Sequence, residues 1–535
     1  MAGAGERKVL FRYQYRRSPD QDRRTCARHP VVIVGAGPVG LAAAIDLALR
    51  GAAVLLLDES DRIGAGSRGI CYAKRTLEIL DRLGVGEQLV ARGVTWKLGK
   101  VFLGNALVYA FDLFPEGGHK MPAFINLQQY YLEQALVERA SALDSIDLRW
   151  SNRVVGLDRG DDGVRLTIAT PDGPYAIEAD WVIAADGARS TIRDLMGLGF
   201  EGLTFEDKFL IADVRMAADF PTERRFWFDP PFHSGQSALM HRQPDNMWRI
   251  DLQLGRDADV ETEQEPGRVL ARLRRMLGDR ELSLEWVSIY RFNCRRLARF
   301  VHGRVVFIGD SAHQVSPFGA RGANSGIQDA ENLAWKLSAV LAGQADIGLI
   351  ETYDAERIQA ADENIGHSTR STDFIAPRSD AERRLRNAVL HLAQRAEFAR
   401  RMVNSGRLST ASIYASPLST PDEATFAGPA RLGAPIPDAP VTTRDGRAGF
   451  LLERLDGAFE VLYVKDGARP NVPDGAKLTV IGEDIVDTTG ACAERLDASP
   501  GATYLLRPDQ HLAARFRRFD GEKVSKAVNR ALGKP

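Results

Sequence analysis

Apolar runs alternate with helical patterns along the first part of the chain. Val31 to Val34 form a short, wholly apolar run that predicts a buried strand, and this run ends at Gly35. Small and apolar residues then follow at helical spacing as far as Leu49, and a second apolar run ends at Asp58. This order predicts a βαβ unit with the crossover of a parallel sheet.

Shorter alternating patterns follow, and they predict short strands. They occupy residues 146–187, where Asp-Gly pairs mark the turns, and return over 205–290. Helical spacing then continues to about residue 405. In the second strand region, one face is predicted to carry Trp248, Ile250, Leu252 and Leu254, and the other Arg249, Asp251 and Gln253.

These patterns predict an α/β protein of several domains, which agrees with a length of 535 residues. We expect a Rossmann-like domain made from residues 30–204, with inserted strands, and from residues 291–405, with a helical extension. Residues 205–290 are expected to form a second sheet. The remaining parts are an N-terminal arm at 1–29, a linker rich in Pro, Ser and Ala at 406–439, and a small α/β domain at 440–535.

Composition and charge exclude several classes of protein. The net charge of -1 gives no overall field that would favour nucleic acid or an acidic membrane. No apolar run reaches the length of a transmembrane helix, and the arginine-rich N-terminus lacks the apolar core of a secretion signal. The 4 cysteines lie far apart, so we expect no disulfide framework, no metal site, and a reducing cytoplasm as the compartment.

The first candidate site is a G-x-G-x-x-G motif between the predicted strand and helix. Glycines in this position let the backbone approach a pyrophosphate, and the helix N-terminus adds N–H groups and a partial positive charge. The acid that ends the second strand, about 20 residues further on, can accept hydrogen bonds from a ribose. This site comprises Gly35, Gly37, Pro38, Val39, Gly40 and Asp58.

Two further stretches place an acid directly after an apolar strand. Asp186 and Gly187 follow the first of these strands, and Arg193 comes shortly after them at helical spacing. Asp310 follows the second, in "RVVFIGD", before a glycine-rich loop and a helix. Ser325 and Gln328 have the spacing of a capping box for that helix.

In this order and at these separations, the three stretches resemble the class A flavoprotein aromatic hydroxylases over about residues 30 to 370. The resemblance implies a Rossmann-like FAD-binding domain with an inserted β-sheet substrate domain, in which residues 205–290 would form the substrate-binding sheet. Near the C-terminus, "YLLRPDQHLAARF" resembles the closing motif of the 3-(3-hydroxyphenyl)propionate, pentachlorophenol and phenol hydroxylase branch. That branch implies a thioredoxin-like C-terminal domain without redox cysteines.

The resemblance also implies roles for single residues. Asp310 would bind the ribityl chain of the flavin, and the helix that begins near Asn324 would direct its N–H groups at the ring. Arg68 matches an arginine near the flavin, and Gln129 matches a glutamine at the ribityl chain. The implied FAD contacts are Gly35, Gly37, Pro38, Val39, Gly40, Asp58, Arg68, Gln129, Asp186, Gly187, Arg193, Asp310, Gly322, Ala323 and Asn324.

The chain departs from the family pattern near the expected substrate. Arg321 stands where many members have glutamine, and it would hold an acidic substrate or the reduced ring, or point to solvent. The position of the aspartate base of phenol hydroxylase falls near Ile70, so any base must come from elsewhere, or none is needed. We expect the pocket between the sheet at 205–255 and the loop at Pro317. Candidates there are Phe228, Phe318 and Arg321 for the pocket, and His233 and Pro317 for catalysis.

The resemblance implies hydroxylation of a small phenolic compound by a flavin C4a-hydroperoxide. FAD would be bound tightly but not covalently, NADH or NADPH would dock transiently, and O2 would be the oxidant. Open alternatives are a larger, polyketide-type polycyclic substrate and a flavin-binding protein without turnover. A halogenase is disfavoured because its W-x-W-x-I-P signature is absent from the sequence. The C-terminal domain suggests a homo-oligomer, most simply a dimer.

Overall fold

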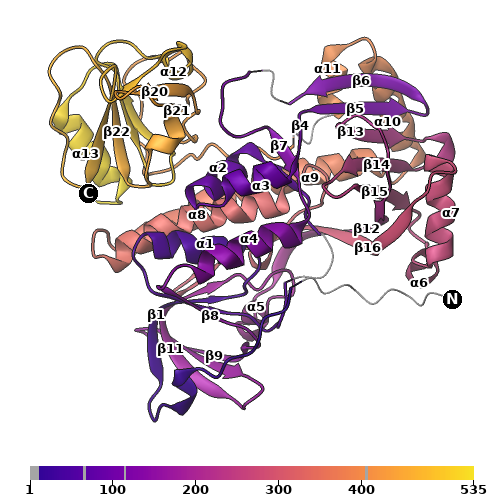
Figure 1. Cartoon of the computed structure of the whole chain (residues 1–535), viewed down its shortest axis with the longest axis horizontal. Coiled ribbons are helices and arrows are strands. Elements are labelled where there is room, and N and C mark those ends of the chain that lie inside the picture. Colours follow the sequence, from indigo (N-terminus) through magenta and orange to yellow (C-terminus); the bar gives the residue numbers. More distant parts are fainter. Residues whose placement is uncertain (1–10, 64–67, 114–115, 404–407, 535) are drawn as a thin grey trace.

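The computed structural model describes residues 11–63, 68–113, 116–403 and 408–534 (Figure 1). Its first sheet is mixed, with parallel strands around β1 (Ala27–Val34) and antiparallel strands at β9 (Arg153–Arg159), β10 (Val164–Ala169) and β17 (Val301–His302). β1 pairs in parallel with β2 (Val54–Leu57) and with β11 (Tyr175–Ala184). Helix α1 (Pro38–Leu49) connects β1 to β2, which confirms the predicted βαβ unit. The other strands of this sheet are β8 (Ile146–Arg149) and β18 (Val305–Phe307).

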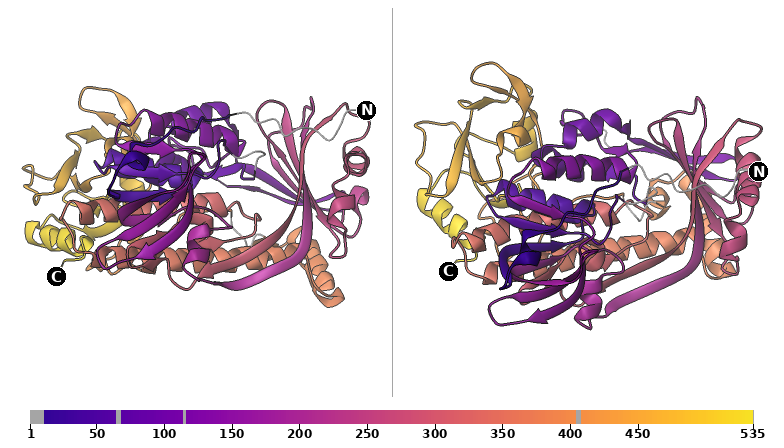
Figure 2. Two further views of the ribbon diagram at one scale, coloured as in Figure 1. Left: turned by 90° about the horizontal axis from the view of Figure 1, so that it is seen from below. Right: turned by 60° about the horizontal axis from the view of Figure 1, so that its bottom comes forward.

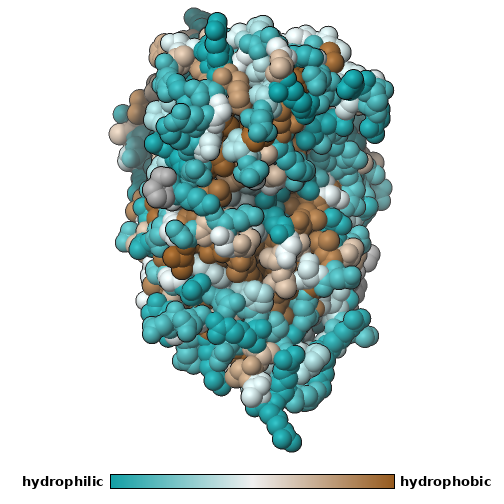
Figure 3. All heavy atoms as spheres, turned by 90° about the vertical axis from the view of Figure 1, so that its left-hand side faces the viewer, coloured by the Kyte–Doolittle hydropathy of each residue, from teal (hydrophilic) through white to brown (hydrophobic). Residues whose placement is uncertain are grey.

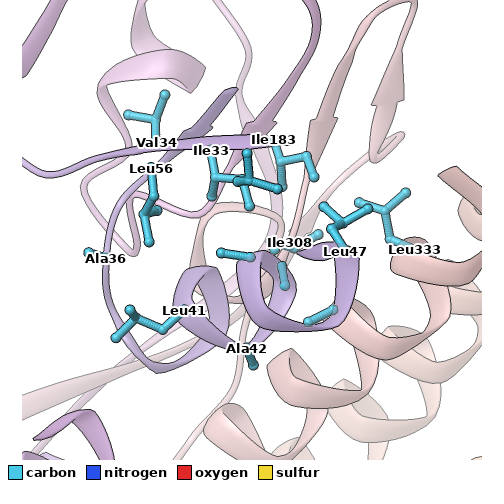
Figure 4. Packing of buried hydrophobic residues seen from close by; sticks show 14 of the residues in the cluster. Ile33, Val34, Ala36, Leu41, Ala42, Leu47, Leu56, Ile183, Ile308 and Leu333 are labelled. Atoms are coloured by element: carbon cyan, nitrogen blue, oxygen red, sulfur yellow. The ribbon is translucent and has the colours of Figure 1, made fainter. Parts of the chain in front are cut away.

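The apolar run of β1 is buried because helices cover the sheet. Ile33 is fully buried between the neighbouring strands, and Leu41 and Leu47 of α1 pack beneath it (Figure 4). Helix α8 (Gly322–Leu341) contributes Leu333 to the same cluster. The other helices on this side are α2 (Lys74–Arg82), α3 (Gly86–Arg92), α4 (Gln129–Ser141) and α5 (Thr191–Leu195).

The second sheet has eight strands and lies on the side of the molecule away from the C-terminus (Figures 1 and 2). Most of its strands come from residues 200–297, but two strands come from a much earlier part of the chain. The parallel pairing of β13 with β5 joins them, and local alternation could not reveal this long-range contact. The strands are β5 (Leu98–Leu103), β6 (Ala106–Asp112), β12 (Phe200–Arg215), β13 (Arg224–Phe228), β14 (Ser237–Arg242), β15 (Met247–Leu254), β16 (Ser283–Leu297) and β19 (His313–Gln314).

The two faces of this second sheet differ. The outer face packs Trp248 and Ile250 against α7 (Pro266–Leu277), beside the short helix α6 (Val260–Glu263). The inner face packs Phe209 and Phe228 against the chain before α8. Helices α9 (Gly348–Ile375), α10 (Asp380–Ala393) and α11 (Glu397–Val403) complete this side. A small sheet of β3 (Cys71–Ala73), β4 (Val94–Trp96) and β7 (Phe124–Asn126) lies nearby.

The C-terminal part forms a mixed α/β unit. β22 (Phe459–Val464) pairs in parallel with β23 (Ala476–Ile481) and antiparallel with β25 (Thr503–Leu506). The face shown in Figure 3, which is the left-hand side of Figure 1, is mostly hydrophilic, and hydrophobic residues gather mainly across its middle. The other elements are β20 (Pro440–Thr443), β21 (Ala448–Phe450), β24 (Ile485–Val486), β26 (Leu512–Phe516), α12 (Ala491–Leu496) and α13 (Gly521–Ala531).

A buried polar seam joins this C-terminal unit to α8 and α9. Arg507 donates to Glu356 of α9 at 2.6 Å, and Trp335 of α8 donates to Asp509 at 3.0 Å. Arg75 of α2 donates to Gln510 at 2.9 Å. The "RPDQH" residues therefore act as the attachment of the last unit to the rest of the chain.

None of the helices in the described ranges combines the length and the apolar composition that crossing a membrane requires.

Candidate functional site

The three glycines of the first motif have different physical roles. A Cβ atom on Gly35, whose φ is +107°, would lie 2.5 Å from the carbonyl oxygen of Ala185. A Cβ atom on Gly40 would lie 2.0 Å from the carbonyl oxygen of Gly35. At Gly37, by contrast, no described atom lies within 4 Å of that position. Gly35 and Gly40 therefore allow internal packing, whereas Gly37 leaves the backbone open to a ligand at the start of α1.

Asp58 fixes the shape of this loop. Its carboxylate accepts hydrogen bonds from the backbone N–H of Ala36 at 2.6 Å and of Ser60 at 2.8 Å. Burial raises the pKa of Asp58 above its usual value, and these two hydrogen bonds oppose the shift. Each carboxylate oxygen keeps a lone pair, so the side chain can still accept a hydrogen bond from a ribose.

The Asp186–Gly187 turn presents a buried acceptor. Asp186 Oδ2 accepts from the N–H of Ile192 at 3.0 Å, but the buried Oδ1 has no hydrogen-bond partner among the described residues. Gly187 has a φ of +76° and no described atom near its Cβ position. Arg193 lies behind the turn, where it donates to the carbonyl of Ala188 at 3.1 Å and stacks on Phe200. Arg193 therefore positions the turn through the backbone.

Asp310 lies at the carboxyl end of β18, beside the start of α8. Its side chain is exposed, yet desolvation raises its pKa, and the charges of His313 and Arg68 oppose this shift. The loop that carries Asp310 is held by Asp329 of α8. Asp329 accepts from the N–H of Gly309 at 2.9 Å and is 2.7 Å from Nε2 of His313. The acid thus projects from a rigid loop toward an open position.

The predicted capping box of α8 is wrong. Arg321 occupies the N-cap and no described side chain caps the helix, while Ser325 Oγ accepts from Arg357 at 2.9 Å instead. Asn324 bonds the backbone of β3, accepting from Ala73 N–H at 2.8 Å and donating to the carbonyl of Cys71 at 2.9 Å. The first N–H groups of Gly322 and Ala323 therefore keep the positive end of the helix available to a ligand.

Gln129 and Arg68, the two other expected flavin contacts, have side chains in different environments. Gln129 Oε1 accepts from the N–H of Gly69 at 2.8 Å, and its amide nitrogen donates to Glu133 at 2.8 Å. Arg68 has an exposed side chain, and its carbonyl accepts from Arg249 at 3.2 Å. Gln129 therefore fixes the backbone beside Arg68, whose charge reaches Asp310.

These groups fit FAD. The open backbone at Gly37 suits a pyrophosphate, Asp58 suits a ribose, and the exposed Asp310 suits a polyol chain. The uncapped start of α8 suits the electron-rich edge of a flavin ring. A βαβ phosphate loop, a D-G turn and a G-D loop on parallel strands of one sheet define the class as an FAD-dependent flavoprotein.

Comparison with known proteins identifies the family. The family model described as "FAD binding domain" matches residues 28–368, and the chain belongs to this family, whose relatives here are named flavin-dependent monooxygenases and hydroxylases. The predicted α/β fold class, FAD as the cofactor and the monooxygenase class are thereby confirmed.

Three known proteins illustrate the similarity. A 6-methylpretetramide 4-monooxygenase of Streptomyces rimosus is 31% identical over 91% of each chain. A 3-(3-hydroxy-phenyl)propionate/3-hydroxycinnamic acid hydroxylase of Mycolicibacterium smegmatis is 26% identical over 90% of each chain. The crystal structure of the flavin-dependent monooxygenase PieE, in complex with FAD and substrate, shares the fold with a TM-score of 0.81. It is 23% identical and covers 95% of this chain and 99% of its own.

The predicted substrate residues fall into two groups. Phe228 and Phe318 lie in one cluster on the inner face, and Pro317 is exposed in the loop beside Phe318. His233 instead lies beside α7, where its Nε2 is 2.6 Å from the carbonyl oxygen of Gln253 and burial lowers its pKa. That contact does not support its predicted role as proton acceptor or substrate ligand.

Arg321 is buried, which excludes the solvent-facing alternative. Its Nη1 donates to Asn364 of α9 at 2.9 Å, while Nε and Nη2 have no partner in the described part of the chain. Burial lowers the pKa of Arg321 to about 10. The side chain therefore adds a buried positive charge at the start of α8.

The sequence analysis did not single out three polar residues of the inner face. Arg224, His241 and Asp251 lie on adjacent strands, on the same side as Phe226. The alternation of "MWRIDLQL" had grouped Asp251 with Arg249, but alternation alone cannot show that a polar face is buried. Their significance depends on strand pairing, which only the structure supplies.

Replacing Asp310 by alanine is expected to lower FAD affinity by about tenfold to a hundredfold, because a hydrogen bond to a charged group contributes about 1.5–3 kcal/mol. Titration of apoprotein with FAD, followed by flavin fluorescence, measures the change. Asp279→Ala, at an exposed position, is the matched control. Equal affinities of the two variants would contradict the assignment of Asp310.

Proposed function

We propose that the protein is an FAD- and NAD(P)H-dependent monooxygenase that hydroxylates a small phenolic compound. The observation that carries the proposal is the aromatic wall beside the flavin loop. Phe318, in the loop before α8, makes edge-to-face contacts with Phe209 at 4.8 Å and with Phe292 at 5.3 Å. Such a wall suits a planar aromatic ring next to the flavin.

FAD, when bound, would supply hydride acceptance from NADH or NADPH and the activation of O2. The residues of this chain would position the partners and exclude water. Asp310 and the start of α8 would hold the flavin, and the inner face would hold the substrate ring. A closed, aromatic-lined site favours transfer of oxygen to the ring over its loss to solvent.

The relatives support a hydroxylase, but their names indicate different aromatic substrates. The relative from Mycolicibacterium smegmatis is named for single-ring hydroxyphenyl acids, and the one from Streptomyces rimosus for a polycyclic pretetramide. We favour the single ring because polar groups interrupt the aromatic lining of the inner face at short intervals. A polycyclic substrate is the second candidate, since the pretetramide enzyme has the higher identity.

Steady-state and stopped-flow oxidation of NADH and NADPH by the FAD-loaded protein tests the proposal. A single-ring phenol is expected to accelerate oxidation by about tenfold or more, about 1.4 kcal/mol in the barrier. Little hydrogen peroxide should form, because the oxygen enters the product.

Acceleration by polycyclic phenols alone would select the second candidate. If every phenol leaves the rate unchanged, or all oxygen appears as peroxide, the protein is a flavin-binding protein without hydroxylase turnover. The choice between NADH and NADPH, a cytoplasmic location and a dimeric state stay predictions.

A further inference from the structure

Four buried polar atoms on the inner face have no hydrogen-bond partner among the described residues. They are Tyr109 Oη, Arg224 Nε, His241 Nδ1 and Asp251 Oδ1. His241 and Tyr109 are each only 5% exposed. Buried polar atoms in native proteins are nearly always paired, so a group of four on one face indicates a polar ligand that completes them.

Strand register brings these side chains together. Asp251 of β15 lies between Leu239 of β14 and Ile211 of β12, and Phe226 of β13 lies opposite Leu239. In the next row, His241 is opposite Arg249. The carboxyl group of Asp251 therefore lies in an apolar row that borders a charged row.

The charged row contacts the segment from Arg68 to Cys71, which leads into β3 and is bonded to the start of α8. Arg249 donates to the carbonyl of Arg68 at 3.2 Å, and Asn324 in the first turn of α8 donates to the carbonyl of Cys71 at 2.9 Å. Asp251 and Arg224 both act on the thiol of Cys71 electrostatically. The unpaired group thus faces the side of the sheet where the flavin ring is expected.

Two of these residues remain available for a ligand. Arg249 is occupied, because its Nε and Nη2 donate to both oxygens of Asp213 at 2.8 Å. Arg224 Nε and Asp251 Oδ1, by contrast, have no hydrogen-bond partner within the described ranges. An arginine and a carboxyl group that are close enough for their charges to act on each other therefore lie on this face, each with a buried unpaired atom.

We propose that Asp251 removes the proton of the substrate's ring hydroxyl and that Arg224 stabilises the oxygen left behind. This inference rests on the proposed hydroxylase function. The O–H bond breaks, the proton moves to Oδ1 of Asp251, and the electron pair stays on the oxygen. The anionic oxygen donates electron density to the ring, which makes the ring a better nucleophile toward an electrophilic oxygen.

The electrostatics suit a base that works near neutral pH. Burial raises the pKa of Asp251 to about 7, Arg249 and Arg224 oppose the shift, and Asp213 adds to it. Burial raises the pKa of Cys71 to about 12, keeps the pKa of His241 well below its usual value and raises that of Tyr109, so these three facing groups are neutral. Asp251 is therefore the group that changes charge as the pH passes through about 7.

The test uses FAD-loaded wild type and Asp251→Asn with phenol and the more acidic 2,3,5,6-tetrafluorophenol as probes. For phenol, Asp251→Asn is expected to lower kcat about a hundredfold or more and to remove the rise of kcat/KM near pH 7. For tetrafluorophenol, which is already ionised, the loss is expected to be at most about tenfold. Asp251→Glu should restore the pH profile. A purely structural defect would lower both rates equally.

Arg224→Met tests the second residue through binding of tetrafluorophenol to the oxidised holoenzyme, followed by the flavin spectrum. The expected loss of affinity is about tenfold or more. Asp257→Asn and Arg291→Met, at exposed positions of the same domain, are the matched controls.

The outcomes separate the two proposals. An active wild type whose phenol profile is unchanged in Asp251→Asn overturns the inference and leaves the hydroxylase function intact. A wild type that forms no hydroxylated product from any phenol overturns the proposed function and the role of Asp251 with it. Unchanged binding in Arg224→Met overturns the role of Arg224.

Discussion

Replacing Gly37 by valine is expected to abolish FAD binding while the apoprotein stays folded. A side chain at this position meets no described atom within 4 Å, so the fold has room for it. It would instead fill the space against which the pyrophosphate lies. We expect FAD affinity to fall a hundredfold or more, about 2.8 kcal/mol. Flavin fluorescence measures the affinity, and thermal unfolding of the apoprotein tests the fold.

Two comparisons make this prediction specific. Gly199→Val, at an exposed glycine that also has no described neighbour within 4 Å, should bind FAD normally. Gly40→Ala should destabilise the apoprotein, because its Cβ would lie 2.0 Å from a backbone oxygen. If Gly37→Val bound FAD as the wild type does, the pyrophosphate could not lie at the start of α1.

Replacing Asp329 by asparagine is expected to destabilise the protein by about 3–5 kcal/mol, because it leaves a buried arginine without its counter-charge. Arg357 Nε donates to Asp329 at 2.6 Å, and both side chains are buried. His313 and the N–H of Gly309 contact the other oxygen, Oδ2, and the single oxygen of asparagine can serve only one of these two sets of donors, so the loop that carries Asp310 loosens. FAD affinity of the folded protein should therefore fall as well.

The matched control for this variant is Asp46→Asn. Asp46 is equally buried and pairs with Arg82 and Arg50, but it lies on α1, away from the Asp310 loop. Urea unfolding should show a similar loss in both variants, while FAD titration should separate them. Normal FAD affinity in folded Asp329→Asn would contradict the positioning role. Burial opposes the shift, but the charges of His313 and Arg357 lower the pKa of Asp329, so its contribution to stability is present above the unfolded value near 3.9 and is lost as the pH falls below it.

The sequence predicted the parts of the fold that depend on local pattern. The βαβ unit, the glycine motif and the acids after their strands follow from a few neighbouring residues, and the structure places Asp58, Asp186 and Asp310 around one sheet. The parallel pairing of β13 with β5 joins residues more than a hundred positions apart, so no local pattern reports it.

Local sequence pattern was also insufficient to identify the residues expected to contact the substrate. His233 drew attention because histidine is a common base, yet its ring nitrogen is engaged with the backbone of Gln253. Asp251 was visible only as one polar position in an alternating strand. Its burial depends on the segment from Arg68 to Cys71 packing against that face, which is a property of the tertiary structure.

The polar seam at Arg507, Asp509 and Gln510 would limit the exchange of C-terminal domains between relatives. Glu356 of α9 also accepts from Lys336 of α8 at 2.8 Å, so this carboxylate connects α8, α9 and the C-terminal unit. A C-terminal domain transplanted from a relative would fit only if the receiving α2, α8 and α9 carried matching partners. The last hundred residues and the flavin-binding helices are therefore expected to be inherited as one unit, although they are separate in the order of the chain.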